Sequence, residues 1–195
     1  MILPIVAYGD PVLRKVAKEI GSDYPKLEEL IANMKQTMYN ASGVGIAAPQ
    51  IGKSIRLFVI DATPFAEDED ITELEKEQLK DFNKVFINPK ILNEEGDEWS
   101  FNEGCLSIPD IREDVFRQES VTFEYLDESF IKHTNTLNGI AARVFQHEYD
   151  HIEGILFTDK LSTLKKRLLK KKLEKISLGK IESDYRMRFP KIKNK

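Results

Sequence analysis

The stretch GIAARVFQHEYDHIEG, residues 139–154, decides how the fold of this chain is interpreted. Ile140 is followed by Val144, His147 and His151 at spacings of four, seven and eleven residues, which is the periodicity of one helix face. We therefore expect a helix here whose apolar stripe continues into the two histidines. Because that stripe faces the protein core, both imidazoles are expected to point inward.

The two histidines form an H-E-x-x-H pattern with Glu148. Histidines four residues apart on a helix can bind one metal ion, and the intervening glutamate then lies beside that ion, where it can act as a general base. The third histidine of the chain, His133, follows Lys132 in a polar segment, and we expect it to lie in a surface turn. The pattern predicts a metal-dependent hydrolase.

A hydrolytic metal site of this kind usually has three protein ligands, so a third must be found. The extended histidine motif fails, because the third residue after Gly154 is Phe157 rather than histidine. Glu174 and Glu182 follow at plausible distances, although both lie in a basic segment. Cys105, in the segment EGCLS, could instead complete a set of two histidines and one thiolate. On spacing alone these alternatives stay open.

Length and composition indicate one globular domain, or one domain with an appendage. The chain has 195 residues, of which 41% are hydrophobic and 32% charged. No apolar stretch approaches the roughly 18 to 20 residues that span a bilayer, and residues 1–8 lack a basic flank and contain Pro4, unlike a signal peptide. A single cysteine cannot form an intramolecular disulfide. We expect a cytoplasmic protein without membrane contact.

Charge is distributed unevenly along the chain. Residues 1–159 carry 15 Lys and Arg against 30 Asp and Glu, a net charge of −15, whereas residues 160–195 carry 14 against 3, a net charge of +11. An acidic body repels nucleic acid, while a basic tail can contact an anionic surface such as RNA. The alternatives are a solvated helix that favours solubility, or a tail that packs on the acidic body.

Periodicity predicts an α+β fold, with mixed or antiparallel β-sheets around the central H-E-x-x-H helix, an N-terminal helix and a C-terminal basic amphipathic helix. The expected elements are a helix at 25–40 that Asp23 could cap, a glycine-rich loop at 42–52, strands at 55–60, 85–92 and 121–126 separated by turns, and a basic helix at 161–176.

These elements suggest two parts. We expect residues 1–160 to form a single catalytic domain, with an acidic surface insertion at about 62–84. Within that insertion, residues 67–81 are dense in acidic residues and are expected to form an exposed segment or a short surface helix outside any site. Residues 161–195 are expected to form a basic helical extension.

Three segments together resemble the motifs of the peptide deformylase family: GVGIAAPQ at 43–50, EGCLS at 103–107 and QHEYDH at 146–151. The segment YGDPVLR at 8–14 is similar to the beginning of that family. The resemblance covers roughly residues 1–160, and the acidic insertion and the basic tail depart from it. It implies removal of the formyl group from the N-terminal formylmethionine of newly synthesised polypeptides, with release of formate.

The resemblance also implies a role for each motif residue. Cys105, His147 and His151 would bind one divalent metal ion per chain, and Glu148 would move protons. The remaining catalytic groups would be the Gln50 amide and the Leu106 backbone N–H, which would stabilise an oxyanion. The candidate substrate contacts are Gly43, Val44, Gly45, Arg112 and Val144.

Further roles are expected for the residues around these motifs. We interpret the missing side chains of Gly43 and Gly45 as room for a substrate backbone. Val44 and Val144 are candidates for an apolar pocket that takes the methionine side chain. Glu103 and Gln146 are expected to orient metal ligands, while Arg112 either approaches the substrate or pairs at the surface.

Cofactor and partners follow from the same resemblance. Thiolate and imidazole ligands accept several divalent ions, and the family points to Fe(II) in the cell, with Zn(II), Ni(II) or Co(II) possible in purified protein. The expected partners are formylmethionyl nascent peptides and, transiently, the ribosome through the basic helix, with the chain a monomer. Two other functions stay open: a peptidase with a different third ligand, and a non-catalytic module stabilised by metal.

Overall fold

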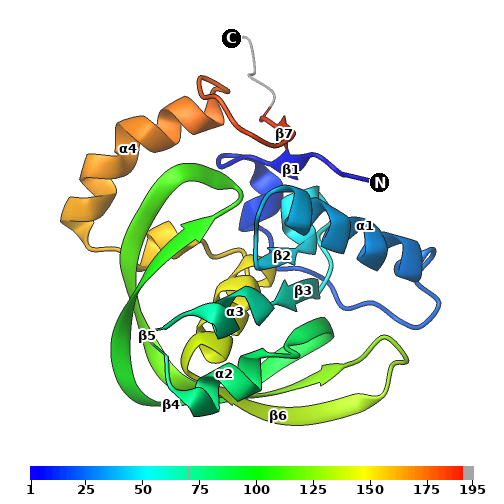
Figure 1. Ribbon diagram of the computed structural model, residues 1–195. Helices are drawn as coiled ribbons and strands as arrows, with labels where there is room; N and C mark the ends of the chain where they lie inside the picture. Colours follow the sequence, from blue (N-terminus) through cyan, green and yellow to red (C-terminus); the bar gives the residue numbers. More distant parts are fainter. Residues whose placement is uncertain (70, 191–195) are drawn as a thin grey trace.

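The protein has an α+β fold built on a five-stranded antiparallel sheet (Figure 1). The computed structural model describes residues 1–69 and 71–190, so residue 70 of the expected insertion and the last five residues of the expected extension lie outside the described part. The sheet order is β2-β3-β4-β5-β6, with the bounds β2 Gly45–Ala47, β3 Leu57–Asp61, β4 Asn83–Cys105, β5 Ile108–Leu126 and β6 Lys132–Asn138. This confirms the expected α+β class and the antiparallel sheet.

Two short strands near the ends of the chain form a second sheet. The parallel pair is β1 (Ile5–Val6) and β7 (Met187–Arg188). The α-helices and the 3-10 helices are α1 Leu27–Asn40, α2 Glu73–Leu79, α3 Gly139–Ile152 and α4 Thr163–Ser177, with η1 Pro11–Arg14, η2 Ala48–Ile51, η3 Thr63–Glu67 and η4 Phe157–Lys160. No helix among the described residues is long and apolar enough to cross a membrane.

Strand β3 is buried on both faces, which explains its unbroken apolar sequence. Phe58 and Ile60 pack in the cluster that contains α3, while Leu57 and Val59 pack in the cluster that contains α1. Since side chains alternate across a strand, one run of five residues joins two core layers. The strand expected at 55–60 is thus observed, with the bounds Leu57–Asp61.

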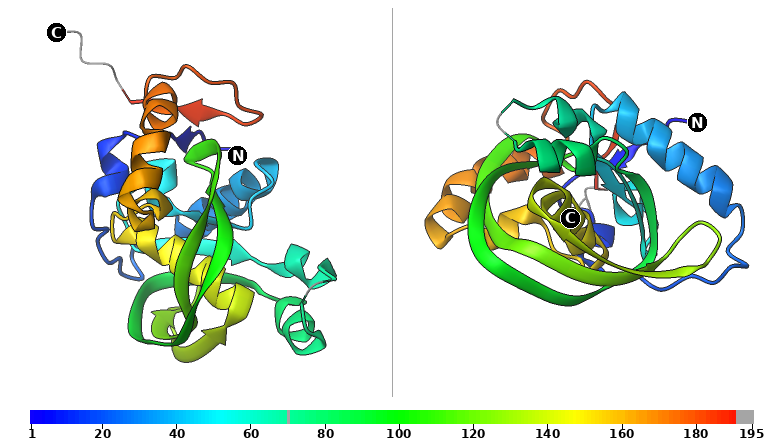
Figure 2. Two further views of the ribbon diagram at one scale, coloured as in Figure 1. Left: turned by 90° about the vertical axis from the view of Figure 1, so that its left-hand side faces the viewer. Right: turned by 60° about the horizontal axis from the view of Figure 1, so that its bottom comes forward.

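Helix α3 lies inside the curve of the sheet. In the right-hand view of Figure 2, β4, β5 and β6 bend around this helix. Phe145 stacks on Phe123 with ring centroids 3.9 Å apart and meets Phe58 and Phe86 edge-on at 5.3 and 5.2 Å. Burial on nearly every side holds the helix in one orientation, so its histidine face is fixed relative to the sheet.

The hairpin of β4 and β5 is much longer than the sequence predicts. Instead of turns between residues 92 and 121, the strands continue to Cys105 and resume at Ile108. Exposed acidic residues between 93 and 100 hide the alternation that marks a strand. Register shifts, one of them at Glu95/Glu98 beside Gly96 with its φ of 87°, bend the hairpin into a curved ribbon.

Strand β6 corrects the expectation for His133. This residue lies within a strand rather than a turn and contacts the Asp127 carboxylate, with 2.7 Å between Nε2 and Oδ2. Its side chain is 39% exposed, so the expected surface position is right. The strand was missed because it has no buried residue and Leu137 is its one apolar side chain.

Two N-terminal expectations also change. Helix α1 begins at Leu27 rather than at Pro25, because Lys26 has a left-handed φ of 56°, and no side chain caps the helix. The expected loop at 42–52 contains an edge strand, β2, and the 3-10 helix η2.

The acidic insertion is attached more firmly than expected. Ala62, Leu79 and Phe82 are buried in the cluster that contains α3. Because these side chains are part of the core, only the segment between them is a surface feature.

Helix α4 buries only part of the apolar pattern of the amphipathic helix expected at 161–176. Leu169, Leu173 and Ile176 are buried, whereas Leu164 and Leu168, which follow the helical spacing, are 65% and 70% exposed. The left-hand view of Figure 2 shows α4 on the outside of the molecule. The helix therefore packs on the protein along a narrow stripe. Leu164, Leu168 and exposed lysines of the helix face the solvent.

Candidate metal centre

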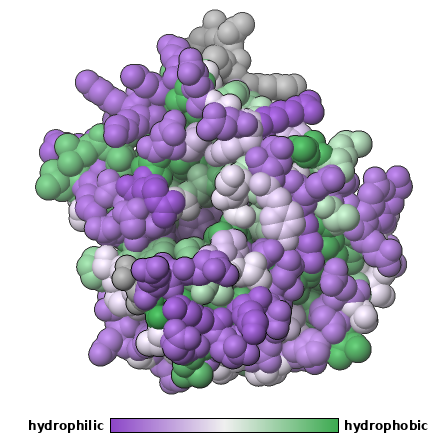
Figure 3. All heavy atoms as spheres, viewed as in Figure 1, coloured by the Kyte–Doolittle hydropathy of each residue, from purple (hydrophilic) through white to green (hydrophobic). Residues whose placement is uncertain are grey.

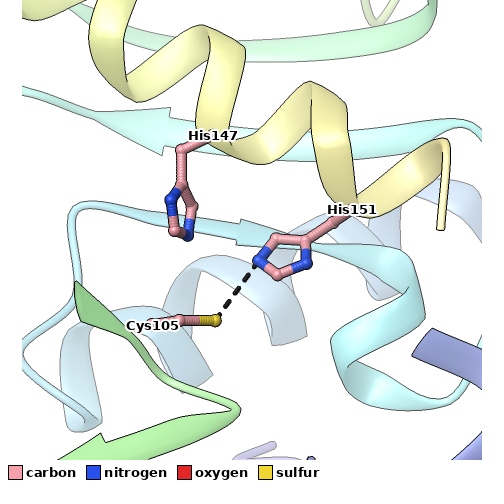
Figure 4. Close-up of side chains that lie close together, drawn as sticks. All are labelled: Cys105, His147 and His151. Atoms are coloured by element: carbon pink, nitrogen blue, oxygen red, sulfur yellow. Dashed lines mark hydrogen bonds between the residues drawn. The ribbon is translucent and has the colours of Figure 1, made fainter. Parts of the chain in front are cut away.

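Cys105, His147 and His151 meet where the end of β4 approaches α3 (Figure 4). Their ligand atoms all lie within 4.8 Å of one another, and Cys105 Sγ is 3.3 Å from His151 Nε2. The two imidazoles project from adjacent turns of α3, with ring centroids 5.0 Å apart. The three residues expected from the sequence are therefore brought together. Glu174, the alternative third ligand, lines a separate groove beside Tyr8.

The donor set and its spacing fit a tetrahedrally coordinated metal ion. With metal–sulfur and metal–nitrogen distances of about 2.3 and 2.0 Å, neighbouring ligand atoms stand roughly 3.5 Å apart. The Nδ1 atom of His147 is engaged by Glu103 Oε2 at 2.9 Å, which leaves its Nε2 as the ligand atom. One thiolate and two imidazoles suit Zn(II), Fe(II), Co(II) and Ni(II).

Glu103 connects the centre to a buried group of ion pairs. Its carboxylate accepts from Arg117 Nε at 2.7 Å and Arg143 Nη1 at 3.1 Å, and Arg117 also donates to Asp150 at 2.7 Å. Burial alone would raise the pKa of Glu103, but hydrogen bonds from His147 and Arg117 reverse this and hold the pKa well below its usual range. An ionised carboxylate in this position fixes the orientation of the His147 ring.

Gln146 does not take part in this network through its side chain. Its Nε2 donates to Glu94 Oε1 at 2.8 Å and to the Gln118 carbonyl at 3.3 Å. The expectation that Gln146 orients a metal ligand is therefore wrong. One position before His147, its side chain lies on another face of α3 and contacts β4 and β5 instead.

Glu148 is buried beside the three ligands. It is 4% exposed, and its Oε2 has no hydrogen-bond partner among the described residues. Burial raises the pKa of Glu148 to about 7. This oxygen is therefore able to accept a proton or a hydrogen bond from a group that binds beside it.

The two motif glycines make room for protein side chains. A Cβ atom on Gly45 would lie 2.4 Å from Glu148 Oε1, and one on Gly43 would lie 2.8 Å from Leu106 Cδ1. Any larger residue at either position would displace the neighbouring side chain. Glycine at these two positions thus leaves room for the side chains of Glu148 and Leu106, a reason that we did not foresee when we assigned the space to a substrate.

Gln50 is aimed at the thiol by its own backbone contacts. Its Oε1 accepts from the Ala47 N–H at 2.8 Å, so its Nε2 faces Cys105 Sγ at 3.5 Å and Ser107 Oγ at 3.4 Å. The side chain is almost completely buried. The amide nitrogen of Gln50 therefore lies next to the sulfur of Cys105, one of the three candidate ligands.

A cleft of about 550 Å³ opens onto these groups. In Figure 3 the face turned to the viewer is hollowed, with apolar side chains lining the hollow and hydrophilic ones around it. The residues expected at the site that line this cleft are Gly43, Val44, Gly45, Gln50, Cys105, Leu106, Arg112, Val144, His147 and Glu148. Arg112 is at the exposed rim, where its Nε donates to Asn102 Oδ1 at 2.9 Å.

Several residues around the cleft were missed from the sequence. Phe65, Phe101 and Tyr185 line it, although they are far apart in the chain and belong to none of the three motifs. Arg143 does carry a local signal, since a charged residue within the apolar stretch at 140–145 indicates a buried ion pair. Nothing local distinguishes the three aromatic residues.

Comparisons with known proteins agree with this geometry. The model of the family described as polypeptide deformylase matches residues 2–167. The chain is 67% identical to a peptide deformylase of Christiangramia forsetii over 193 residues, 99% of this chain and 98% of that one, and 63% identical to one of Flavobacterium johnsoniae with the same coverage. The crystal structure of a peptide deformylase from Legionella pneumophila, 39% identical, aligns with a TM-score of 0.76 over 92% of this chain and 98% of that one.

Proposed function

The chain belongs to the polypeptide deformylase family, and we propose that it performs this family's reaction with Cys105, His147 and His151 as metal ligands. It is a metal-dependent hydrolase that removes the formyl group from the N-terminal methionine of formylated peptides. The observation that carries the ligand assignment is the meeting of one sulfur and two imidazole nitrogens within 4.8 Å of one another.

We propose Fe(II) as the ion used in the cell, on the basis of the family resemblance and a donor set that also accepts Zn(II), Ni(II) and Co(II). When bound, a divalent ion supplies Lewis-acid chemistry, which polarises a carbonyl oxygen and makes water more acidic. All catalytic groups in this proposal belong to residues 1–160, the part that we propose as the catalytic domain.

Glu148 moves the proton in the proposed mechanism. Its unpaired carboxylate oxygen lies beside the ligands, where it accepts a proton from the attacking water as the water oxygen bonds to the formyl carbon. The same proton passes to the amide nitrogen as the carbon–nitrogen bond breaks, so that formate and a free amine leave. The absence of a side chain at Gly45 leaves room for the carboxylate in this position.

Gln50 and Leu106 stabilise the negative charge that grows on the formyl oxygen. The Gln50 amide faces the cysteine sulfur at 3.5 Å, and Leu106 directly follows that cysteine in the chain. Two fixed N–H donors on one side of the cleft form an oxyanion hole, and losing one such donor typically costs about 2.7 to 4 kcal/mol of transition-state stabilisation.

The substrate is proposed to lie along β2. This strand is at the edge of the sheet, where an extended peptide can pair with backbone groups that face away from β3, apart from the Ala47 N–H, which donates to Gln50. Val44 and Val144 line the cleft next to it and offer an apolar surface for the methionine side chain, while Arg112 stands at the rim near the peptide that follows.

Formate release tests the function directly. Protein purified without oxygen should release formate from a formyl-methionyl peptide in proportion to its metal content, measured on the same sample. Cys105→Ser should lose both metal and activity, whereas Glu174→Gln should keep both. The opposite pattern would identify a peptidase with Glu174 as its third ligand and would overturn the ligand assignment.

The basic helix suggests where the enzyme works. We propose that α4 contacts ribosomal RNA transiently, because Lys166, Arg167 and Lys170 are exposed along one groove. The enzyme would then act as a monomer in the cytoplasm, where its substrate is made. Combined Lys166→Glu and Lys170→Glu substitutions should reduce co-sedimentation with ribosomes, while Lys15→Glu with Lys18→Glu should not. If both double variants reduce co-sedimentation equally, the contact is not specific to α4.

A further inference from the structure

The turn between β4 and β5 is held from outside the sheet at both of its residues. Leu106 and Ser107 form this turn directly after the metal ligand Cys105. The backbone N–H of Tyr8 donates to the Ser107 carbonyl at 2.8 Å, and the hydroxyl of Tyr185 donates to the Leu106 carbonyl at 2.8 Å. Each carbonyl of the turn thus has its own donor from a distant part of the chain.

The two donors are linked to each other by the small parallel sheet. Ile5 N–H donates to the Arg186 carbonyl and Ala7 N–H to the Arg188 carbonyl, both at 2.9 Å. Tyr8 lies two residues after the end of β1, and Tyr185 lies two residues before the start of β7. Figure 1 shows β1 and β7 side by side. A single structural unit made of both ends of the described chain holds the turn.

Tyr185 reaches the cleft from beyond the part that matches the family model. That match ends at residue 167, yet Tyr185 lines the same cleft as Cys105 and Leu106. Its ring is half-buried and packs against the cluster that contains α1, so the hydroxyl is not free to swing away. Met187 and Phe189 pack on a third core cluster, which includes Leu13, Ile108 and Leu173, and they fix the segment that carries Tyr185.

We propose that Tyr185 is a positioning residue for deformylation: its hydrogen bond to the Leu106 carbonyl sets the orientation of the turn that presents the Leu106 N–H to the formyl oxygen. The proposal rests on the role given to Leu106 above. A donor that must meet a developing oxyanion acts only if its direction is fixed beforehand. Fixing the carbonyl of Leu106 restricts the backbone rotation of that residue, and with it the direction of its N–H.

The kinetic test is Tyr185→Phe, which removes the hydroxyl and keeps the ring. Because the oxyanion contact forms only in the transition state, kcat should fall about three- to tenfold while KM changes less than twofold. Tyr39→Phe is the matched control, since it removes a hydroxyl that donates to Asp61 at 2.6 Å outside the cleft lining, and its kcat should be unchanged.

A spectroscopic readout follows the hydrogen bond itself. The sequence contains two Leu-Ser pairs, 106–107 and 161–162, so labelling with carbonyl-¹³C leucine and ¹⁵N serine gives one signal from each. In the zinc-loaded protein, Tyr185→Phe should shift the Leu106 carbonyl and speed amide exchange in the turn, while the Leu161 signal stays in place. If the substitution instead loosened the packing of the whole segment after residue 160, both carbonyl signals would shift.

The outcomes separate this proposal from the proposed function. A shifted Leu106 carbonyl with reduced kcat supports the positioning role. A shifted carbonyl with unchanged kcat, or an unshifted carbonyl, overturns it while wild-type formate release leaves the deformylase function standing. A rise in KM at constant kcat would also overturn it, because Tyr185 would then act as a wall of the substrate cleft.

Discussion

Helices α3 and α4 are almost equal in length, at 14 and 15 residues, but they have opposite surroundings. The sheet curves around α3, and even its charged residues Arg143 and Asp150 are buried and paired. Helix α4 touches the body along three buried side chains and leaves its lysines in solvent. The candidate metal ligands are thus on the helix that is packed on nearly all sides. The positive charge is on the helix that has few contacts with the rest of the protein.

The largest expected effect on this comparison is at Glu148 of α3. Glu148→Ala should keep the metal and lower kcat by a factor of about 10² to 10⁴, because the general base is lost. Glu174→Ala on α4 should leave kcat unchanged. Steady-state formate release with metal analysis measures both. If Glu148→Ala still hydrolyses the substrate at the wild-type rate, the proton-transfer role is wrong and the protein would have to work without this carboxylate.

The next largest effect is expected on the free energy of unfolding when Arg117, which connects α3 to the sheet, is replaced. Arg117→Met removes the bonds at 2.7 Å that Arg117 makes to the buried carboxylates of Glu103 and Asp150, so the free energy of unfolding should fall by about 3 to 5 kcal/mol. Lys165 on α4 pairs with Glu113 at 2.8 Å but is 39% exposed, and Lys165→Met should cost less than about 1 kcal/mol. Urea unfolding at fixed metal content compares the two. Similar losses would show that α4 is held as firmly as α3.

A smaller loss of stability is expected when a buried side chain of α4 is shortened. Leu173 is 8% exposed in the third core cluster, and Leu173→Ala should lower the free energy of unfolding by about 2 to 3 kcal/mol. The same urea titration measures it. A loss near zero would mean that α4 does not stay packed on the body in solution, and the distinction between its two faces would disappear.

The smallest effect is expected on the opposite face of the same helix. Leu168→Ala should change the free energy of unfolding by no more than about 0.5 kcal/mol, since the side chain is 70% exposed. Any reduction in ribosome co-sedimentation by this variant would then report a lost contact rather than a loosened fold. A large loss of stability would show that this face is covered in the folded protein.

Much of the site could be predicted because its residues carry strong local signals. The spacing of His147 and His151 with the apolar stripe fixes both the helix and its inward face, and the unbroken run of β3 marks a buried strand. For the helix and for β3, one stretch of sequence contains the whole physical reason. Cys105 stayed one of several candidates on spacing, and it was assigned through the resemblance of its segment to a family motif.

The missed features depend on partners that are distant in sequence. The ribbon between 93 and 120 is exposed on one side and bulged, so apolar alternation does not reveal its pairing. Tyr185 reaches the cleft only because β7 pairs with β1, nearly the full chain away. Leu164 and Leu168 match the helical period but lie beyond the reach of the sheet, so a local pattern could not tell the buried stripe from the exposed one.

The register of the β4–β5 hairpin has a consequence for changes in chain length. Gly104 pairs with Arg112 and Cys105 with Ile108, across a shift that sets which face the thiol takes. Because neighbouring side chains of a strand point to opposite faces, one residue added between Phe101 and Cys105 would turn the sulfur away from α3. An addition near Gly96, where the strand is already irregular, can be absorbed by the bulge, so length variation is tolerated at one end of the ribbon and abolishes metal binding at the other.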